Sequence, residues 1–194
     1  MFPKLFFVRS LGSVKIDFFI VFVYSVKSFA RRLVMFKVGD IAVYPAHGVG
    51  KIVAIEIKEV AGDKYTFYVM NILENNMKVM VPTNNANAVG LRRVISNDMV
   101  PKIFDIFKEK RITVDSQTWN RRFREYTEKI KTGSVFEIAE VLKDLFLLKT
   151  QKELSFGERK LLDTARNLLL KELVIVTGKE KEMLEKEINS IFGK

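Results

Sequence analysis

A tryptophan and a group of basic residues give this 194-residue sequence its clearest indication of chemistry. Arginine guanidinium groups pair with phosphate through parallel hydrogen bonds and keep their charge in proteins. The group lies near the start of a predicted helix, whose free N–H groups also favour anions. An apolar side chain beside such cations is what minor-groove binders insert between base pairs. One interpretation of this segment is therefore DNA binding by Trp119, Arg121, Arg122, Arg124 and Lys129.

The same segment also has the pattern of a buried helix face. Trp119, Phe123, Tyr126 and Ile130 recur at helical spacing, so they share one side of a helix. On this interpretation the tryptophan packs in the core and the arginines form a solvated face, and the spacing by itself favours it. A residue in the first turn can still project past the end of a domain, so both interpretations stay open.

Residues 96–194 are predicted to form a helical domain, because glycine is sparse and apolar residues recur with a helical period. Asn97 can cap the first helix. Ser155 and Glu158 have the spacing of a capping box, which indicates a helix start. Gly133 and Gly178 indicate helix ends. The expected helices cover about 97–109, 118–133, 134–150, 155–178 and 179–192.

Residues 35–95 are predicted to form a small antiparallel β-barrel, which makes the fold class α+β. Apolar and polar residues alternate through 51–58 and 65–70, as in strands with one buried face. The segment 48–50, Gly-Val-Gly, matches neither glycine-rich phosphate-binding pattern and fits a tight turn. Closure removes exposed strand edges, so we expect a closed or nearly closed barrel. The expected strands are 41–44, 50–58, 65–72 and 77–82.

Composition excludes several classes of site. The chain has no cysteine and a single histidine, which excludes disulfides, cysteine nucleophiles and thiolate or multi-histidine metal sites. His47 has no nucleophile nearby in sequence, and Glu137 and Glu140 have the spacing of a solvated helix face. We therefore expect no enzyme, no catalytic residue, no metal and no cofactor. The net charge of +10 favours a polyanionic partner, either nucleic acid or an anionic membrane surface.

Residues 1–34 differ from the rest of the chain. Their apolar run, 18–26, is far shorter than the roughly 20 residues that a membrane-spanning helix needs. Three interpretations stay open. The favoured one is a start codon placed too early, with Met35 as the true first residue. The others are a signal or membrane-surface anchor, and an extra element packed on the body.

The order of several motifs resembles the CarD family of bacterial transcription regulators over residues 35–194. The amino-terminal motifs are also similar to the polymerase-interacting domain of transcription-repair coupling factor, so the helical motifs select the CarD family. The motifs are 36–40 Phe-Lys-Val-Gly-Asp, 43–50 Val-Tyr-Pro-Ala-His-Gly-Val-Gly, 81–82 Val-Pro, 89–92 Val-Gly-Leu-Arg, 119–123 Trp-Asn-Arg-Arg-Phe and 154–160 Leu-Ser-Phe-Gly-Glu-Arg-Lys.

The resemblance implies a Tudor-like barrel that binds the β subunit of RNA polymerase and a helical domain that contacts promoter DNA. Trp119 would then be a minor-groove wedge that stabilises the open complex, with the arginines on phosphates and little sequence specificity. Polymerase contacts would map near Lys58, Val60 and Met80. Some relatives have arginine at the positions of Lys58 and Met80, so this surface departs from the family pattern.

The resemblance also implies a cytoplasmic protein with no small-molecule substrate and no membrane partner. The alternative is a non-specific nucleic-acid-binding module without polymerase contact. Such a module would share the basic helical half, and binding of polymerase by the barrel distinguishes the two.

Overall fold

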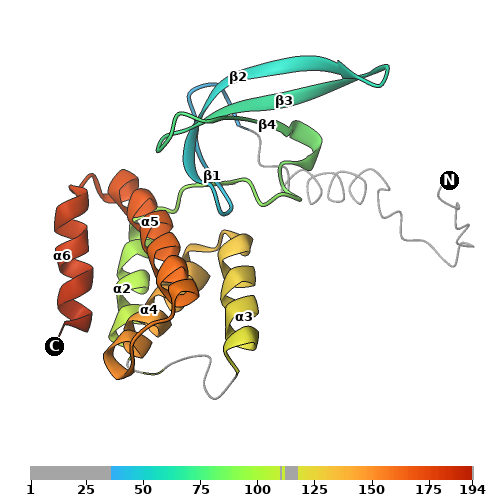
Figure 1. The fold of residues 1–194 in the computed structure, drawn as a ribbon. Coiled ribbons are helices and arrows are strands. Elements are labelled where there is room, and N and C mark those ends of the chain that lie inside the picture. The colour runs from blue at the N-terminus through green and yellow to red at the C-terminus, as the bar shows by residue number, and fades with distance from the viewer. Residues whose placement is uncertain (1–35, 110, 112–117, 194) are drawn as a thin grey trace, which may run out of the picture. The chain divides into compact units, whose positions relative to one another are not determined.

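The amino-terminal half of the described chain folds into an antiparallel sheet of five strands (Figure 1). The computed structural model describes residues 36–109, 111 and 118–193. The strands pair in the order β4-β3-β2-β1-β5. They are β1 (Ile41–Tyr44), β2 (Gly48–Val60), β3 (Asp63–Ile72), β4 (Lys78–Pro82) and β5 (Arg92–Arg93).

The sheet is barrel-like but open, because the two edge strands that the structure describes, β4 and β5, do not pair with each other. The α+β class is confirmed, whereas full closure of the barrel is not observed. All four expected strands are present. The fifth, β5, was missed because a two-residue strand is too short to show alternation.

Strands β2 and β3 are longer than expected and project beyond the rest of the sheet. Ala61 and Gly62 both have positive φ, 53° and 88°, so a two-residue turn joins the strands and pairing continues up to it. Strand β1 pairs with β2 only at 48–51, and β4 pairs with β3 only at 67–71. The segment 57–66 is therefore a two-stranded ribbon, which we call the β2–β3 ribbon.

The carboxy-terminal half consists of α-helices whose ends follow local sequence signals. Gly133 and Gly178 end their helices in the left-handed conformation, with φ of 71° and 68°. Ser155 and Glu158 form the expected capping box. Asn97 does not cap the first α-helix: it begins a short 3-10 turn, η2 (Asn97–Met99), and Met99 is the N-cap. The helices are α2 (Val100–Lys108), α3 (Trp119–Thr132), α4 (Val135–Gln151), α5 (Phe156–Thr177) and α6 (Lys181–Phe192).

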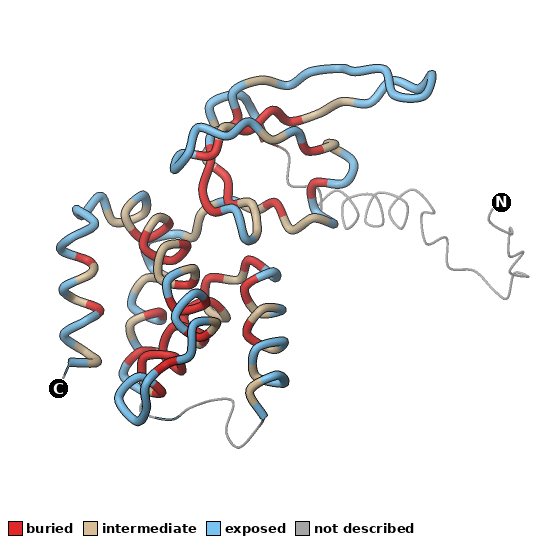
Figure 2. Tube along the Cα trace, in the orientation of Figure 1, coloured by how far each residue is buried: buried red, intermediate tan, exposed pale blue. Residues whose placement is uncertain are grey.

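Two hydrophobic cores stabilise the described residues. The sheet core is centred on Ile52, Met70 and Ile72. The helical core is built around α4, which packs against α2, α3 and α5 and is buried along most of its length (Figure 2). All described residues nevertheless fall in one compact unit. The boundary between 35–95 and 96–194 therefore stays a prediction.

Two sets of predictions fall outside the described residues. They concern the three interpretations of 1–34 and most of the segment between the expected helices 97–109 and 118–133. Among the helices that the structure does describe, none is both long and apolar enough to cross a membrane.

Candidate functional site

Trp119 is the first residue of α3 and is half-buried at that end of the helix. Its ring lies 5.2 Å from the ring of Phe123, centroid to centroid, in a tilted arrangement. Gly157, at the start of α5, provides the space for the indole, because a Cβ atom on this glycine would come within 2.9 Å of the ring. The indole therefore packs against the helical core without being enclosed by it.

The two sequence interpretations of this helix face each describe part of it. Tyr126 and Ile130 are buried in the core, as the spacing predicts. Phe123 is exposed, which the core interpretation did not predict. The difference arises because the apolar spacing describes only one direction around the helix, whereas burial also depends on how far the neighbouring helices extend.

Phe156 is a large exposed aromatic residue that the sequence analysis did not single out. It is 78% exposed and directly precedes Gly157, on which the indole lies. The capping box could have indicated this position, because Ser155 is the N-cap and Phe156 is then the first helical residue. The described surface near Trp119 thus includes more apolar area than one indole supplies.

The three predicted arginines point in different directions. Arg121 and Arg124 are exposed to solvent. The Arg122 side chain is only 15% exposed, and its Nη2 atom lies 3.7 Å from Oε1 of Glu158. Lys129 is also half-buried, and its Nζ atom lies 2.8 Å from Oε2 of Glu140. Phosphate binding by all of these residues stays a prediction. The geometry favours Arg121 and Arg124 as phosphate ligands over Arg122 and Lys129, because they are exposed.

The carboxylate of Glu158 binds several side-chain and backbone groups behind Trp119. Its side chain is 1% exposed and accepts hydrogen bonds from Lys152 Nζ at 2.9 Å and from the Ser155 backbone N–H at 2.8 Å. Burial acts to raise the pKa of this carboxyl, but the hydrogen bonds from Lys152 and Ser155 outweigh it and lower the pKa. Glu158 is therefore a structural anion that links α3, through Arg122, to the start of α5.

Replacing Glu158 with glutamine should remove a pH-dependent part of the stability. The folded pKa is lowered from its ordinary value of 4.5, so the stabilisation is present above that pH and is lost as the pH falls through the folded pKa. We expect Glu158→Gln to lower the free energy of unfolding at pH 7 by about 1–3 kcal/mol and to flatten its acid dependence. Urea unfolding between pH 7 and pH 3 measures both effects. Glu153→Gln is the control, since Glu153 is 95% exposed; equal acid slopes in the two variants would contradict the assignment.

A cluster of three polar side chains lies in the helical core beneath this region. The Tyr126 hydroxyl donates to Asp144 Oδ2 at 3.3 Å, and Lys143 Nζ lies 3.6 Å from Asp144 Oδ1. Burial, together with the charge and the hydrogen bond of Asp144, raises the pKa of Tyr126 above its ordinary value. Tyr126 is therefore a neutral donor at physiological pH, and this group is part of the structure that supports α3.

The three predicted polymerase-binding residues lie on one face of the sheet. Lys58 and Val60 are two residues apart in β2, and alternation places them on the same side. Met80 pairs with Val69, which shares that side through the β2–β3 register, whereas its neighbour Val81 belongs to the sheet core. All three residues are exposed. Polymerase binding by this face stays a prediction.

No cluster of metal-ligating side chains was found among the described residues. No candidate cofactor site is assigned to them.

Comparisons with known proteins agree on both halves of the chain. The family model described as CarD, C-terminal domain, matches residues 102–189, and the one described as CarD-like/TRCF RID domain matches residues 36–95. The protein YdeB of Bacillus subtilis (strain 168), named as a candidate transcription factor, is 39% identical over 159 residues, which cover 82% of this chain and 100% of that protein.

Two solved structures are similar to part of the chain. The structure titled CdnLNt, from Myxococcus xanthus, is 54% identical and covers 32% of this chain and 89% of its own, with a TM-score of 0.29. The solution structure of the 72-residue N-terminal domain of Myxococcus xanthus CarD is 46% identical and covers 30% of this chain and 79% of its own, with a TM-score of 0.28.

Proposed function

Since this chain belongs to the CarD family of transcription regulators, we propose that it binds the RNA polymerase β subunit through its sheet and promoter DNA through its helices. In this proposal residues 35–95 are the polymerase-binding domain and residues 96–194 are the DNA-binding domain. The protein acts in the bacterial cytoplasm and stabilises the open promoter complex. The proposal includes no catalytic step, no cofactor and no small-molecule substrate.

The observation that carries the DNA half of the proposal is the half-buried indole of Trp119 at the start of a helix that also carries exposed arginines. The indole rests on Gly157 and Phe123, so its position is fixed before DNA arrives. Arg121 and Arg124 lie within the next two turns of α3 and are exposed. An apolar wedge at the end of a helix that also carries exposed cations fits the junction between paired and melted DNA, where a base step is already partly unstacked.

The wedge would act by making reannealing of the bubble less favourable. Reclosing recovers stacking of about 1–2 kcal/mol per base step, but an inserted indole must first leave. The protein therefore shifts the equilibrium only by the difference between its affinities for open and closed DNA. Phosphate contacts add affinity with little sequence specificity. Tethering to polymerase raises the local concentration of the wedge, so weak DNA binding suffices.

The sheet half of the proposal is supported by the exposed face that carries Lys58, Val60 and Met80. Methionine cannot form the ion pair that arginine makes in some relatives, so contact at Met80 would be apolar. Polymerase binding would then depend less on salt than DNA binding does, because the latter releases counterions.

A two-part binding experiment on the full chain tests the proposal. We expect Met80→Glu to weaken binding to purified polymerase and to leave binding to duplex DNA unchanged. We expect the double variant Arg121→Ala/Arg124→Ala to do the reverse and to reduce the salt slope of DNA binding by about 2. Lys179→Ala/Lys181→Ala removes the same charge just before α6 and at its first residue, and is the control for DNA.

The outcomes separate the proposal from its alternative. Unchanged polymerase binding in Met80→Glu and in a matched Val60→Glu variant would favour a nucleic-acid-binding module without polymerase contact. Equal losses of DNA affinity in the α3 and α6 double variants would show that DNA responds only to net charge, and the proposed site would then be wrong.

A further inference from the structure

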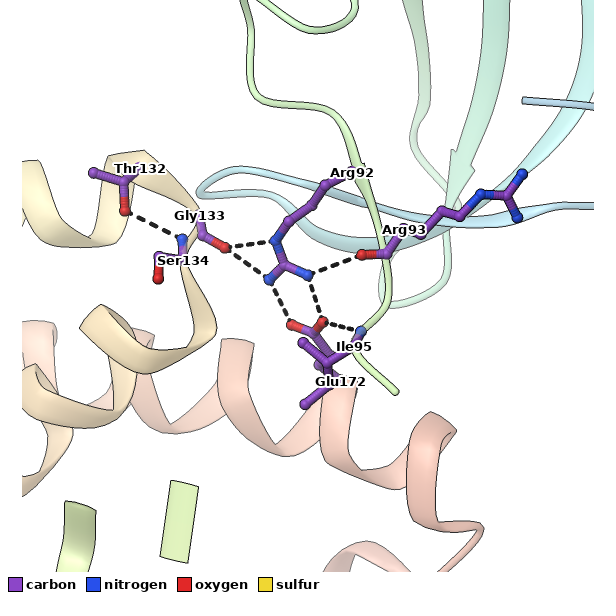
Figure 3. Close-up of polar contacts among 7 residues, drawn as sticks. All are labelled: Arg92, Arg93, Ile95, Thr132, Gly133, Ser134 and Glu172. Carbon is purple, nitrogen blue, oxygen red and sulfur yellow. Dashed lines mark hydrogen bonds and ion pairs between the residues drawn. The ribbon is translucent and has the colours of Figure 1, made fainter. Parts of the chain in front are cut away.

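Arg92 of β5 connects the sheet to two helices through one guanidinium group (Figure 3). Its Nη1 and Nη2 atoms donate to the two carboxylate oxygens of Glu172 in α5, at 2.6 and 2.8 Å. Its Nε and Nη2 atoms donate to the backbone carbonyl of Gly133, which ends α3, at 2.8 and 2.7 Å. The backbone N–H of Ile95 completes the group by donating to Glu172 at 3.0 Å. We call these residues the Arg92 clasp.

The clasp differs from an ordinary surface ion pair in its burial and geometry. The Glu172 side chain is 3% exposed and that of Arg92 is 25% exposed. Two parallel hydrogen bonds between a guanidinium and a carboxylate fix direction as well as distance. A carboxylate this deeply buried needs its donors, because removing one partner leaves an uncompensated charge. The clasp therefore resists opening far more than an exposed pair would.

Close backbone packing supports the same junction. A Cβ atom on Gly133 would lie 2.8 Å from Cγ of Pro45, in the turn between β1 and β2. A Cβ atom on Gly90 would lie 2.9 Å from the same Pro45 atom. Both glycines have positive φ, 71° and 76°. The ring of Pro45 thus packs against the end of α3 where Arg92 binds. Steric contact and hydrogen bonding therefore fix the same end of this helix to the sheet.

The two helices that meet at the clasp are also the two that hold Trp119. Helix α3 begins with Trp119 and ends at the Gly133 cap, 14 residues later. Helix α5 begins beside Gly157, on which the indole rests, and carries Glu172 toward its other end. A helix of this length spans about 21 Å. One arginine of the sheet therefore binds both helices at the ends opposite the wedge.

From this arrangement we infer that Arg92 is a positioning residue that sets the distance and direction between the sheet and Trp119. The inference rests on the proposed function, since the role of Arg92 is to present the wedge at a fixed place relative to bound polymerase. With the clasp closed, α3 and α5 act as a rigid spacer. With the clasp open, both binding surfaces are intact, but the wedge samples many positions and its effective concentration at the DNA junction falls.

Distances between spin labels test the rigidity directly in the full chain. The chain has no cysteine, so Lys51→Cys, where β2 pairs with both β1 and β3, and Glu182→Cys in α6, both exposed, give one label at each chosen position. We expect one narrow distance distribution in the parent and a broad one in Arg92→Ala. Arg93→Ala is the matched control, because it removes the same side chain from the same strand, but its ion pair is with Asp40, the residue before β1, rather than with a helix. Equal widths in the Arg92 and Arg93 variants would overturn the inference.

The lifetime of the open complex tests the consequence. We expect Arg92→Ala to shorten the lifetime about fivefold or more, while the separate affinities for polymerase and duplex DNA stay as in Arg93→Ala. A broadened distribution with an unchanged lifetime, on a promoter that responds to Trp119→Ala, would overturn the positioning role. If Trp119→Ala itself has no effect, the proposed function fails, and the label distances still decide whether Arg92 joins sheet and helices.

A second variant tests the clasp without leaving a buried, unpaired charge. Arg92→Ala leaves Glu172 buried with its charge, which could unfold the protein. The double variant Arg92→Met/Glu172→Gln removes both charges and keeps an acceptor for Ile95 N–H. It should fold, as circular dichroism would report, and should still show the broad distribution. A narrow distribution in this folded variant would contradict the clasp.

Discussion

Trp119→Ala is expected to shorten the lifetime of the open promoter complex about tenfold and to leave polymerase binding intact. The change removes the wedge but none of the contacts of the sheet, and a loss of about 1.4 kcal/mol of selective affinity for open DNA gives this factor. The indole rests on Gly157 and Phe123 rather than deep in the core, so its removal should destabilise the fold little. Dissociation after a competitor challenge, with purified polymerase and a responsive promoter, measures the lifetime.

Two controls make this result specific to the indole. Trp119→Phe keeps an aromatic ring and should retain part of the effect. Asn120→Ala changes the exposed neighbour of the tryptophan and should retain all of it. An unchanged lifetime in Trp119→Ala, with the variant still bound to polymerase, would refute the wedge mechanism.

Asp144→Ala is expected to lower the free energy of unfolding by about 3–5 kcal/mol, because it takes the carboxylate away from a buried lysine. Lys143 and Asp144 are 1% and 0% exposed, and Lys143 would be left near Glu109, whose side chain is 68% exposed. The Tyr126 hydroxyl would lose its acceptor as well. Urea unfolding followed by the fluorescence of the single tryptophan measures the loss.

The contribution of each member can be separated. Lys143→Met/Asp144→Leu removes both charges and should restore much of the lost stability. Tyr126→Phe should cost about 1 kcal/mol, the usual value for one hydrogen bond. Asp105→Ala is the exposed control, with a side chain that is 67% exposed. A loss in Asp144→Ala no greater than in Asp105→Ala would show that the buried group contributes little.

Local sequence signals predicted the helix ends well. The features that these signals missed, strand β5 and the open barrel, depend on long-range contacts. The glycines at 133 and 178 and the capping box at Ser155 act within a few residues, so pattern alone locates them. The pairing of β5 with β1 joins positions about 50 residues apart and leaves no local trace. Openness of the barrel also depends on strand pairing, which alternation does not report.

The candidate DNA-binding site likewise has features that local sequence signals predict and features that depend on long-range contacts. Sequence spacing grouped Arg122 with Arg121 and Arg124, because all three follow the tryptophan within five residues. Only the fold reveals that Arg122 faces Glu158, since that carboxylate comes from a helix 36 positions further along. The role of Arg92 was invisible for the same reason, because its partner Glu172 is 80 residues away.

The β2–β3 ribbon has a dynamic consequence. Through 57–66 neither strand has a third neighbour, and Ile57 at its base is 70% exposed. Isolated two-stranded hairpins are marginally stable in water, so its backbone amides should exchange with deuterium well before those of Ile52 or Met70 in the sheet core. Protection that appears there on mixing with a partner would therefore locate contact without any substitution.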